Sequence, residues 1–125
     1  MSTIQSPSMR TAIYVGTHGN LSLAKSKVVL SGAAIGDIVE MLELPIGLDV
    51  QGVRVSTTGL GASVTGTIKV GETEIKSDVD LASESVVDIP CDLYTKEKAA
   101  LTVTIAGAAA TGTLRVNPTY IAKGY

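Results

Sequence analysis

Polar and apolar residues alternate strictly along three segments of the chain, Ser63–Val70, Ala99–Ala106 and Thr113–Tyr120. Successive side chains of a β-strand point to opposite faces, so this pattern predicts three strands with one buried and one solvated face. The residues expected to face inward are Val64, Gly66, Ile68, Val70, Leu101, Val103, Ile105, Leu114, Val116, Pro118 and Tyr120.

Shorter apolar segments between turn signals predict the other strands. They are Thr11–Val15, Lys25–Leu30, Asp37–Leu44, Val50–Thr58, Thr73–Lys76, Val79–Leu81 and Ser85–Ile89. Gly71-Glu72 fits a tight hairpin turn, and Gly52 indicates a β-bulge. Because proline lacks an N–H group, Pro90 is expected to close a strand. Pro118 is expected to place the last strand at a sheet edge or to mark where it leaves the sheet.

The segment Asp37–Leu44 carries apolar residues on both faces of its expected strand. Such a pattern favours a strand covered on both sides, with a second subunit as one of the covers. Val39 and Met41 are therefore candidate interface residues. The only plausible helical turn is Leu93–Lys98, which is too short to form a stable helix alone.

Many short strands with frequent turns predict an all-β protein: an antiparallel β-sandwich of the jelly-roll type with an extended N-terminal arm. Residues 10–125 are expected to form a single domain. Residues 1–9 are mostly polar, contain Pro7, and are expected to form the arm. The arm and its junction with the domain contribute the other interface candidates, which are Met1, Ile4, Pro7, Met9 and Arg10.

Charge changes sign twice along the chain although the net charge is only −2. The residues before Asp37 carry three bases and no acid, the stretch Asp37–Asp92 has a net charge of −8, and the remainder has +3. This asymmetry suits attraction between copies or docking on a charged surface, unless folding intermixes the charges. The core must consist of Val, Ile, Leu and Ala, because the chain has no Phe or Trp.

Candidate catalytic groups are few. His18 is the single histidine and Cys91 the single cysteine, so a multi-histidine metal site and an internal disulfide are excluded within one chain. Asp78, Asp80, Glu84, Asp88 and Asp92 lack the spacing of a calcium loop and are interpreted as a solvated acidic face. We predict no enzymatic activity, cofactor, metal or nucleic-acid partner.

No apolar run approaches the ~20 residues of a membrane helix, and no signal peptide is evident. The expectation is a protein with no membrane partner that is made and folded in a reducing cytosol.

Four segments of the sequence carry a family resemblance. They are Gly36-Asp37-x-Val39-x-Met41-Leu42-x-Leu44-Pro45-x-Gly47 with Val53-x-Val55-x-Thr57, Ser63-x-Thr65-x-x-Ile68-x-Val70-Gly71, and Ala100–Leu114. The chain resembles the small capsid decoration or cement proteins of tailed bacteriophages. The resemblance implies a non-enzymatic jelly roll on the outer capsid surface of a virion, made in the host cytoplasm. It also implies two partners: the major capsid protein, and further copies of the chain in a dimer or trimer. It implies no catalytic residues.

Two alternatives stay open. A tail, neck or fibre-associated virion component would share the β architecture and differ in copy number. A carbohydrate-binding β-sandwich would need exposed aromatic side chains, for which the sequence offers only Tyr14, Tyr94, Tyr120 and Tyr125.

Overall fold

The computed structural model describes residues 3–6, 9 and 21–122, and within them it contains ten strands in two sheets. The strands are β1 (Thr3–Gln5), β2 (Leu21–Leu23), β3 (Lys27–Ala33), β4 (Ile38–Leu44), β5 (Leu48–Thr58), β6 (Thr65–Val70), β7 (Thr73–Asp80), β8 (Glu84–Tyr94), β9 (Ala99–Ala106) and β10 (Ala110–Ala122). The expected strand Thr11–Val15 and His18 lie outside the described residues.

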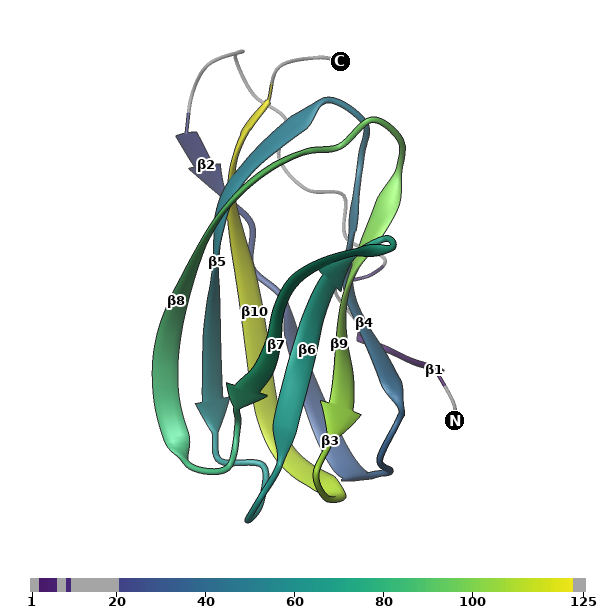
Figure 1. Ribbon diagram of the computed structural model, residues 1–125, viewed down its shortest axis with the longest axis vertical. Helices are drawn as coiled ribbons and strands as arrows, with labels where there is room; N and C mark the ends of the chain where they lie inside the picture. The colour runs from purple at the N-terminus through teal and green to yellow at the C-terminus, as the bar shows by residue number, and fades with distance from the viewer. Residues whose placement is uncertain (1–2, 7–8, 10–20, 123–125) are drawn as a thin grey trace.

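The two sheets lie one behind the other as a sandwich (Figure 1). One has the order β1-β4-β9-β6-β7, and the other has β2-β10-β5-β8 with β3 also paired to β10. Strands β3 to β10 therefore pair as β3 with β10, β4 with β9, β5 with β8 and β6 with β7, all antiparallel. This order is the one expected of a jelly roll, and the predicted β-sandwich is confirmed.

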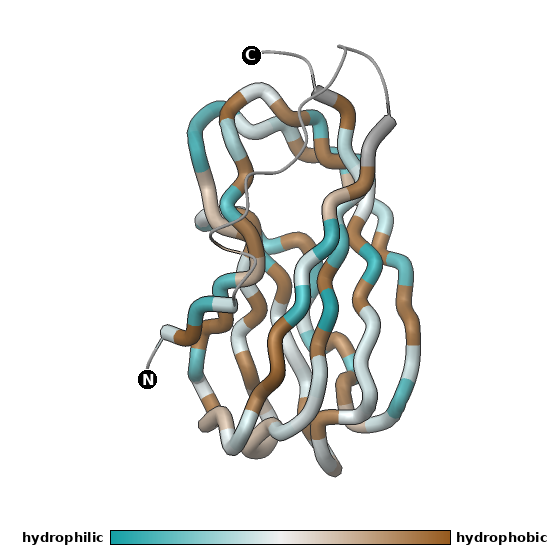
Figure 2. Tube along the Cα trace, turned by 180° about the vertical axis from the view of Figure 1, so that it is seen from behind, coloured by the Kyte–Doolittle hydropathy of each residue, from teal (hydrophilic) through white to brown (hydrophobic). Residues whose placement is uncertain are grey.

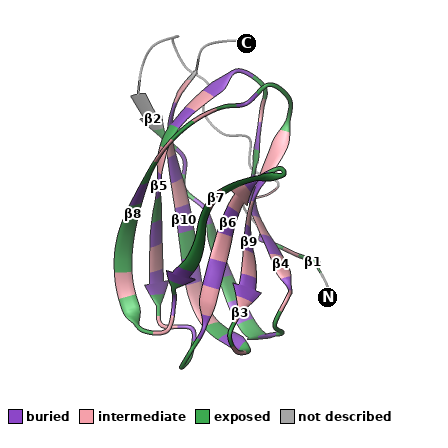
Figure 3. Cartoon of the chain, viewed as in Figure 1, coloured by how far each residue is buried: buried purple, intermediate pink, exposed green. Residues whose placement is uncertain are grey.

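Alternating side chains build the core between the sheets. Apolar and polar residues alternate along the strands in Figure 2, and the inward positions are buried in Figure 3. The predicted inward residues of β9 and β10 are buried as expected, including Leu101, Ile105 and Tyr120. Val, Leu and Ile supply most of the core, as the absence of Phe and Trp requires.

Strand β4 buries both of its apolar sets for a reason the alternation did not show. Its pairing with β9 shifts register between Glu40 and Leu42, so Met41 is the extra residue. Val39 and Met41 are buried in one phase of the strand, and Leu42 and Leu44 are buried in the opposite phase. A β-bulge of this kind adds one residue and inverts the alternation. The predicted burial of both apolar sets is present, and one chain by itself buries all four side chains without a second subunit.

The bulge predicted at Gly52 is present. The register shifts between Val50 and Gly52 where β5 pairs with β8, and the facing ladder shifts between Thr119 and Tyr120. An added Cβ at Gly52 would lie 3.3 Å from the Ile89 carbonyl oxygen, so glycine allows the close approach of β8.

Two predictions about proline are wrong for the same reason, which is that strand neighbours are not visible in the sequence. Pro90 does not close a strand: β8 continues to Tyr94, and it tolerates proline because it pairs only with β5 and forms an edge.

The expected helical turn at Leu93–Lys98 is instead the end of β8 and a bend. Likewise, Thr73–Lys76 and Val79–Leu81 are not separate strands, because β7 runs through Thr73–Asp80 with two register shifts.

Pro118 lies in a central strand and not at an edge. On one side β10 pairs with β5 throughout, and on the other side its ladder passes from β3 to β2 near Pro118. Ser26 fills this interruption: its N–H donates to Asn117 Oδ1 at 3.0 Å, and its hydroxyl donates to the Val116 carbonyl. Proline is tolerated because the regular ladder is interrupted where its N–H would be needed.

The described part of the N-terminal arm lies against the domain. Strand β1 pairs in parallel with the edge of β4, with Thr3 opposite Ile38. Beyond it, Ser6 is buried, and its hydroxyl donates to the Met41 carbonyl at 2.8 Å. These residues form an outer strand of the sheet and do not project from it.

Candidate interaction surface

Among the described residues, neither a metal-binding cluster nor an activated cysteine is present. No group of three or more His, Cys, Asp or Glu side chains among them is placed to hold a metal ion. Cys91 is half-buried, and burial, followed by the charges of Asp92 and Asp49, raises the pKa of its thiol. A raised pKa keeps the thiol protonated, which is the opposite of what a nucleophilic cysteine requires.

The outer face of the β3-β10-β5-β8 sheet carries a group of cations. Arg115 of β10 lies directly opposite Lys27 of β3 on one side and Ser56 of β5 on the other. Arg54 lies one pleat along β5, and Lys25 precedes β3. We call Lys25, Lys27, Arg54 and Arg115 the basic face; all four are exposed.

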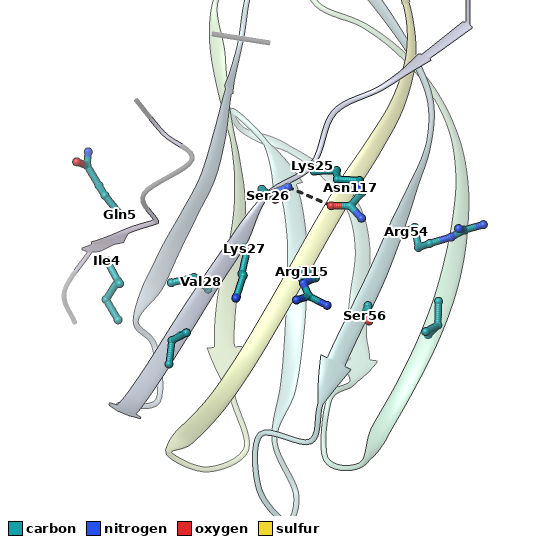
Figure 4. A pocket seen from close by; sticks show the side chains of 12 residues that line it. Ile4, Gln5, Lys25, Ser26, Lys27, Val28, Arg54, Ser56, Arg115 and Asn117 are labelled. Atoms are coloured by element: carbon teal, nitrogen blue, oxygen red, sulfur yellow. Dashed lines mark hydrogen bonds between the residues drawn. The ribbon is translucent and has the colours of Figure 1, made fainter. Parts of the chain in front are cut away.

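A shallow, open depression of about 1150 Å³ follows this face. In Figure 4, Lys25 and Lys27 come from the β3 side, Arg115 and Asn117 from β10, and Arg54 and Ser56 from β5. Val29 and Val86 also line it and are 68% and 63% exposed. The depression therefore combines positive charge with apolar surface, a composition suited to contact with another macromolecule and too open to enclose a small ligand.

Three of the four cations form no ion pair with the residues that the structure describes. Arg54 Nε lies 2.8 Å from Asp88 Oδ1, and this ion pair is exposed. The other ion pair of the described part joins Lys98 to Glu43, so Lys25, Lys27 and Arg115 form none with any described residue. Lys27 and Arg115 repel each other, since like charges directly opposite on neighbouring strands are destabilising.

The lateral edge of the sandwich that β7 and β8 form is acidic. Strands β7 and β8 end the two sheets on the same side (Figure 1), and together they carry six acids against Lys76 alone. The acids are Glu74, Asp78, Asp80, Glu84, Asp88 and Asp92, and all are exposed. We call them the acidic edge; the predicted solvated acidic face agrees with this arrangement.

Known structures share this fold. A chain from the capsid of Ralstonia phage GP4 superposes with a TM-score of 0.74 at 17% identity, covering 98% of this chain and 99% of that one. A chain of the cyanophage Pam1 capsid asymmetric unit gives a TM-score of 0.66 at 26% identity, covering 90% and 91%. A chain from the acid-stable capsid of Helicobacter pylori bacteriophage KHP30 gives 0.58 at 20%, covering 84% and 90%.

The fold is that of phage capsid chains. No protein-family model matches the sequence, and no curated protein matches it. The part of the chain that the structure describes includes no helix with the length and apolar character needed to cross a membrane.

Of the predicted interface residues, Ile4 of β1 lines the depression on the basic face. Val39 and Met41 have no accessible surface in the chain, because both belong to the core between the sheets. Ile4 and Met9 are partly exposed near β4. Met1, Pro7 and Arg10 lie outside the described residues.

Sequence reasoning missed Lys25, Lys27, Arg54 and Arg115 as a group. Arg115 is far from the lysines in sequence and meets them only through the pairing of β3 with β10. The usable signal was the segregation of charge, since both terminal stretches are basic and the middle is acidic.

Proposed function

We propose that this chain is a non-enzymatic structural protein of a bacteriophage virion that decorates the outer capsid and cements neighbouring capsid subunits. The main support is the match to the Pam1 capsid chain, which has 26% identity over about nine-tenths of both chains. The fold shared with the GP4 and KHP30 capsid chains agrees with it.

The extent of these matches supports an accessory component. Each matched capsid chain is covered over at least 90% of its length by this one small β-sandwich. The same domain thus accounts for nearly the whole of a capsid component in three phages. A component of this size adds contacts to a shell more readily than it encloses a genome.

Cementing requires contact area and repetition, and no chemistry. Each copy would bury part of its exposed sheet faces on the major capsid protein and on neighbouring copies. Many weak contacts held in fixed positions act as one strong clamp, because each bound copy raises the effective concentration of the next contact.

Particle composition tests this proposal. Intact particles are purified on a density gradient, and this chain is quantified against the major capsid protein by mass spectrometry. A ratio approaching one copy per capsid subunit, or a fixed simple fraction of it, is expected. A few copies per particle would assign the chain to the tail, neck or fibres, and its absence from particles would overturn the virion role.

The described aromatic residues do not favour the carbohydrate-binding alternative. Tyr120 is completely buried and Tyr94 is 36% exposed. Tyr14 and Tyr125 lie outside the described residues. Sugar-binding sites stack rings on exposed aromatic side chains, and Tyr94 by itself makes no such platform.

A further inference from the structure

We propose that copies of this chain associate head to tail, with the acidic edge of one copy seated on the basic face of the next. This contact joins two copies of the chain and is separate from binding to the capsid. Only its location on a capsid surface rests on the proposed function. Its occupant is defined by charge: the edge strands β7 and β8 of a second copy.

The basic face has an electrostatic cost that the isolated chain does not offset. Lys27 and Arg115 are directly opposed on neighbouring strands, and Lys25 lies close by. None of the three forms an ion pair within the described part of the chain. An incoming acidic surface would remove this repulsion, so the face is set to bind anions of a partner.

The acidic edge offers the complementary charge. Glu74 and Asp78 of β7 are exposed, and neither forms an ion pair with a described residue. Two acidic edges repel each other, which disfavours pairing of like edges between copies. An acidic edge therefore meets attraction only on a surface such as the basic face.

The positions of the two surfaces set the symmetry of the contact. Strand β3 lies at one end of its sheet and β8 at the other, and β7 ends the second sheet on the β8 side. The two surfaces adjoin along β8, where Asp88 pairs with Arg54. Lys27 and Arg115 belong to one sheet, and Glu74 and Asp78 belong to β7 of the other, so each copy can offer one group to each of two neighbours. Such a heterologous contact propagates and closes into a ring where the rotation between copies allows.

Apolar surface accompanies the charges. Val29 and Val86 line the depression and are exposed in the isolated chain. A second copy seated there would cover both, which adds a hydrophobic contribution to the charge pairing. The charges would then select the partner and its orientation.

Charge reversal on each surface tests the proposal. One variant combines Lys27→Glu with Arg115→Glu, and the other combines Glu74→Lys with Asp78→Lys, both on β7 of the other sheet. Sedimentation velocity is run over a concentration series at about 50 mM and about 500 mM NaCl. The wild type is expected to associate at low salt and to dissociate at high salt. The self-association affinity of each variant alone is expected to be at least about tenfold lower than that of the wild type.

Mixing the two variants provides the decisive measurement. One has two negative surfaces and the other has two positive surfaces, so an equimolar mixture is expected to associate in alternation. The matched control is Lys96→Glu with Lys98→Glu, which changes the net charge by the same amount between β8 and β9. It removes the Lys98–Glu43 ion pair and no residue of either surface, and it is expected to behave as the wild type. Circular dichroism of each variant verifies folding.

Four outcomes would overturn the proposal: a monomeric wild type at every concentration, self-association of either reversed variant at the wild-type level, no association in the mixture, or loss of association in the control. Binding of the Lys27→Glu, Arg115→Glu variant to capsid shells is measured in parallel. If shell binding is lost while the wild type is monomeric, the basic face belongs to the capsid contact. Copy number in particles is measured separately, so the head-to-tail contact can fail while the capsid role stands.

Discussion

At the scale of single residues, Gly107 combines two constraints in the turn from β9 to β10. Its φ of +84° lies in the region that favours glycine, and an added Cβ would stand 1.9 Å from the Ser63 carbonyl oxygen. Gly32 has a similar φ of +68° with nothing within 4 Å of the Cβ position. Comparing alanine substitutions at Gly107 and Gly32 therefore separates the cost of backbone strain from the cost of a steric clash.

Gly107→Ala is expected to destabilise the protein by at least about 3 kcal/mol, since the turn and the Ser63 loop must move apart. Gly32→Ala carries only the backbone strain and should cost about 1–2 kcal/mol. Urea denaturation followed by circular dichroism gives both values. Equal losses at the two positions would show that the Ser63 loop moves freely.

Val39 tests the position of β4 in the core. Val39→Asp would bury a carboxylate with no partner and is expected to cost more than about 4 kcal/mol, which is enough to unfold a marginally stable domain. Val86→Asp is the matched control, because Val86 is 63% exposed on β8. Thermal unfolding of both variants decides: a folded Val39→Asp protein would contradict the core position of this residue.

At the scale of elements, the β5–β8 pair shows how an edge strand is held. Arg54 and Asp88 face each other across the two strands and form an exposed ion pair. The hydrogen bond from Arg54 is the main cause that lowers the pKa of Asp88, with its charge acting in the same direction. The folded state therefore favours the ionised carboxylate.

A lowered pKa determines the sign of the pH dependence. The contribution of Asp88 is present above the ordinary pKa of aspartate and is lost as pH falls through its lowered value. The urea midpoint of the wild type is expected to exceed that of Asp88→Asn near neutral pH, and the difference should narrow below about pH 4. In an Arg54→Gln background the same comparison should show no such change, and a persistent change would assign it to another group.

At the scale of the whole molecule, the arm residues belong to the sandwich without being needed to close it. The two antiparallel sheets of four strands, β3-β10-β5-β8 and β4-β9-β6-β7, exist without β1. Strand β1 covers the free edge of β4 and adds the buried hydroxyl of Ser6. The exposed β4 edge would otherwise present unpaired backbone groups.

Deletion of residues 1–9 is expected to leave a folded domain that binds capsid shells more weakly than the full chain. Co-sedimentation with shells lacking this protein measures the binding, and circular dichroism verifies the fold. Full-length Ser6→Ala is the control, because it removes the contact with Met41 and keeps the arm. Equal shell binding by the truncated and full chains would show that the arm takes no part in it.

The sequence alone is enough to predict the all-β class, most of the strands and the residues that face inward. These features depend on the local alternation of side chains and on turns such as Gly71-Glu72, which the neighbours of each residue specify. It also determined the absence of an aromatic-rich core and the separation of charges along the chain.

The tertiary structure is needed to know which strands are neighbours. It placed Pro118 in a central strand beside an interrupted ladder, carried β8 past Pro90 at an edge, and inverted the phase of β4 at a bulge. It also brought Arg115 opposite Lys27 to form the basic face. These results depend on pairing between residues far apart in the chain, and alternation within one strand carries no information about its partner.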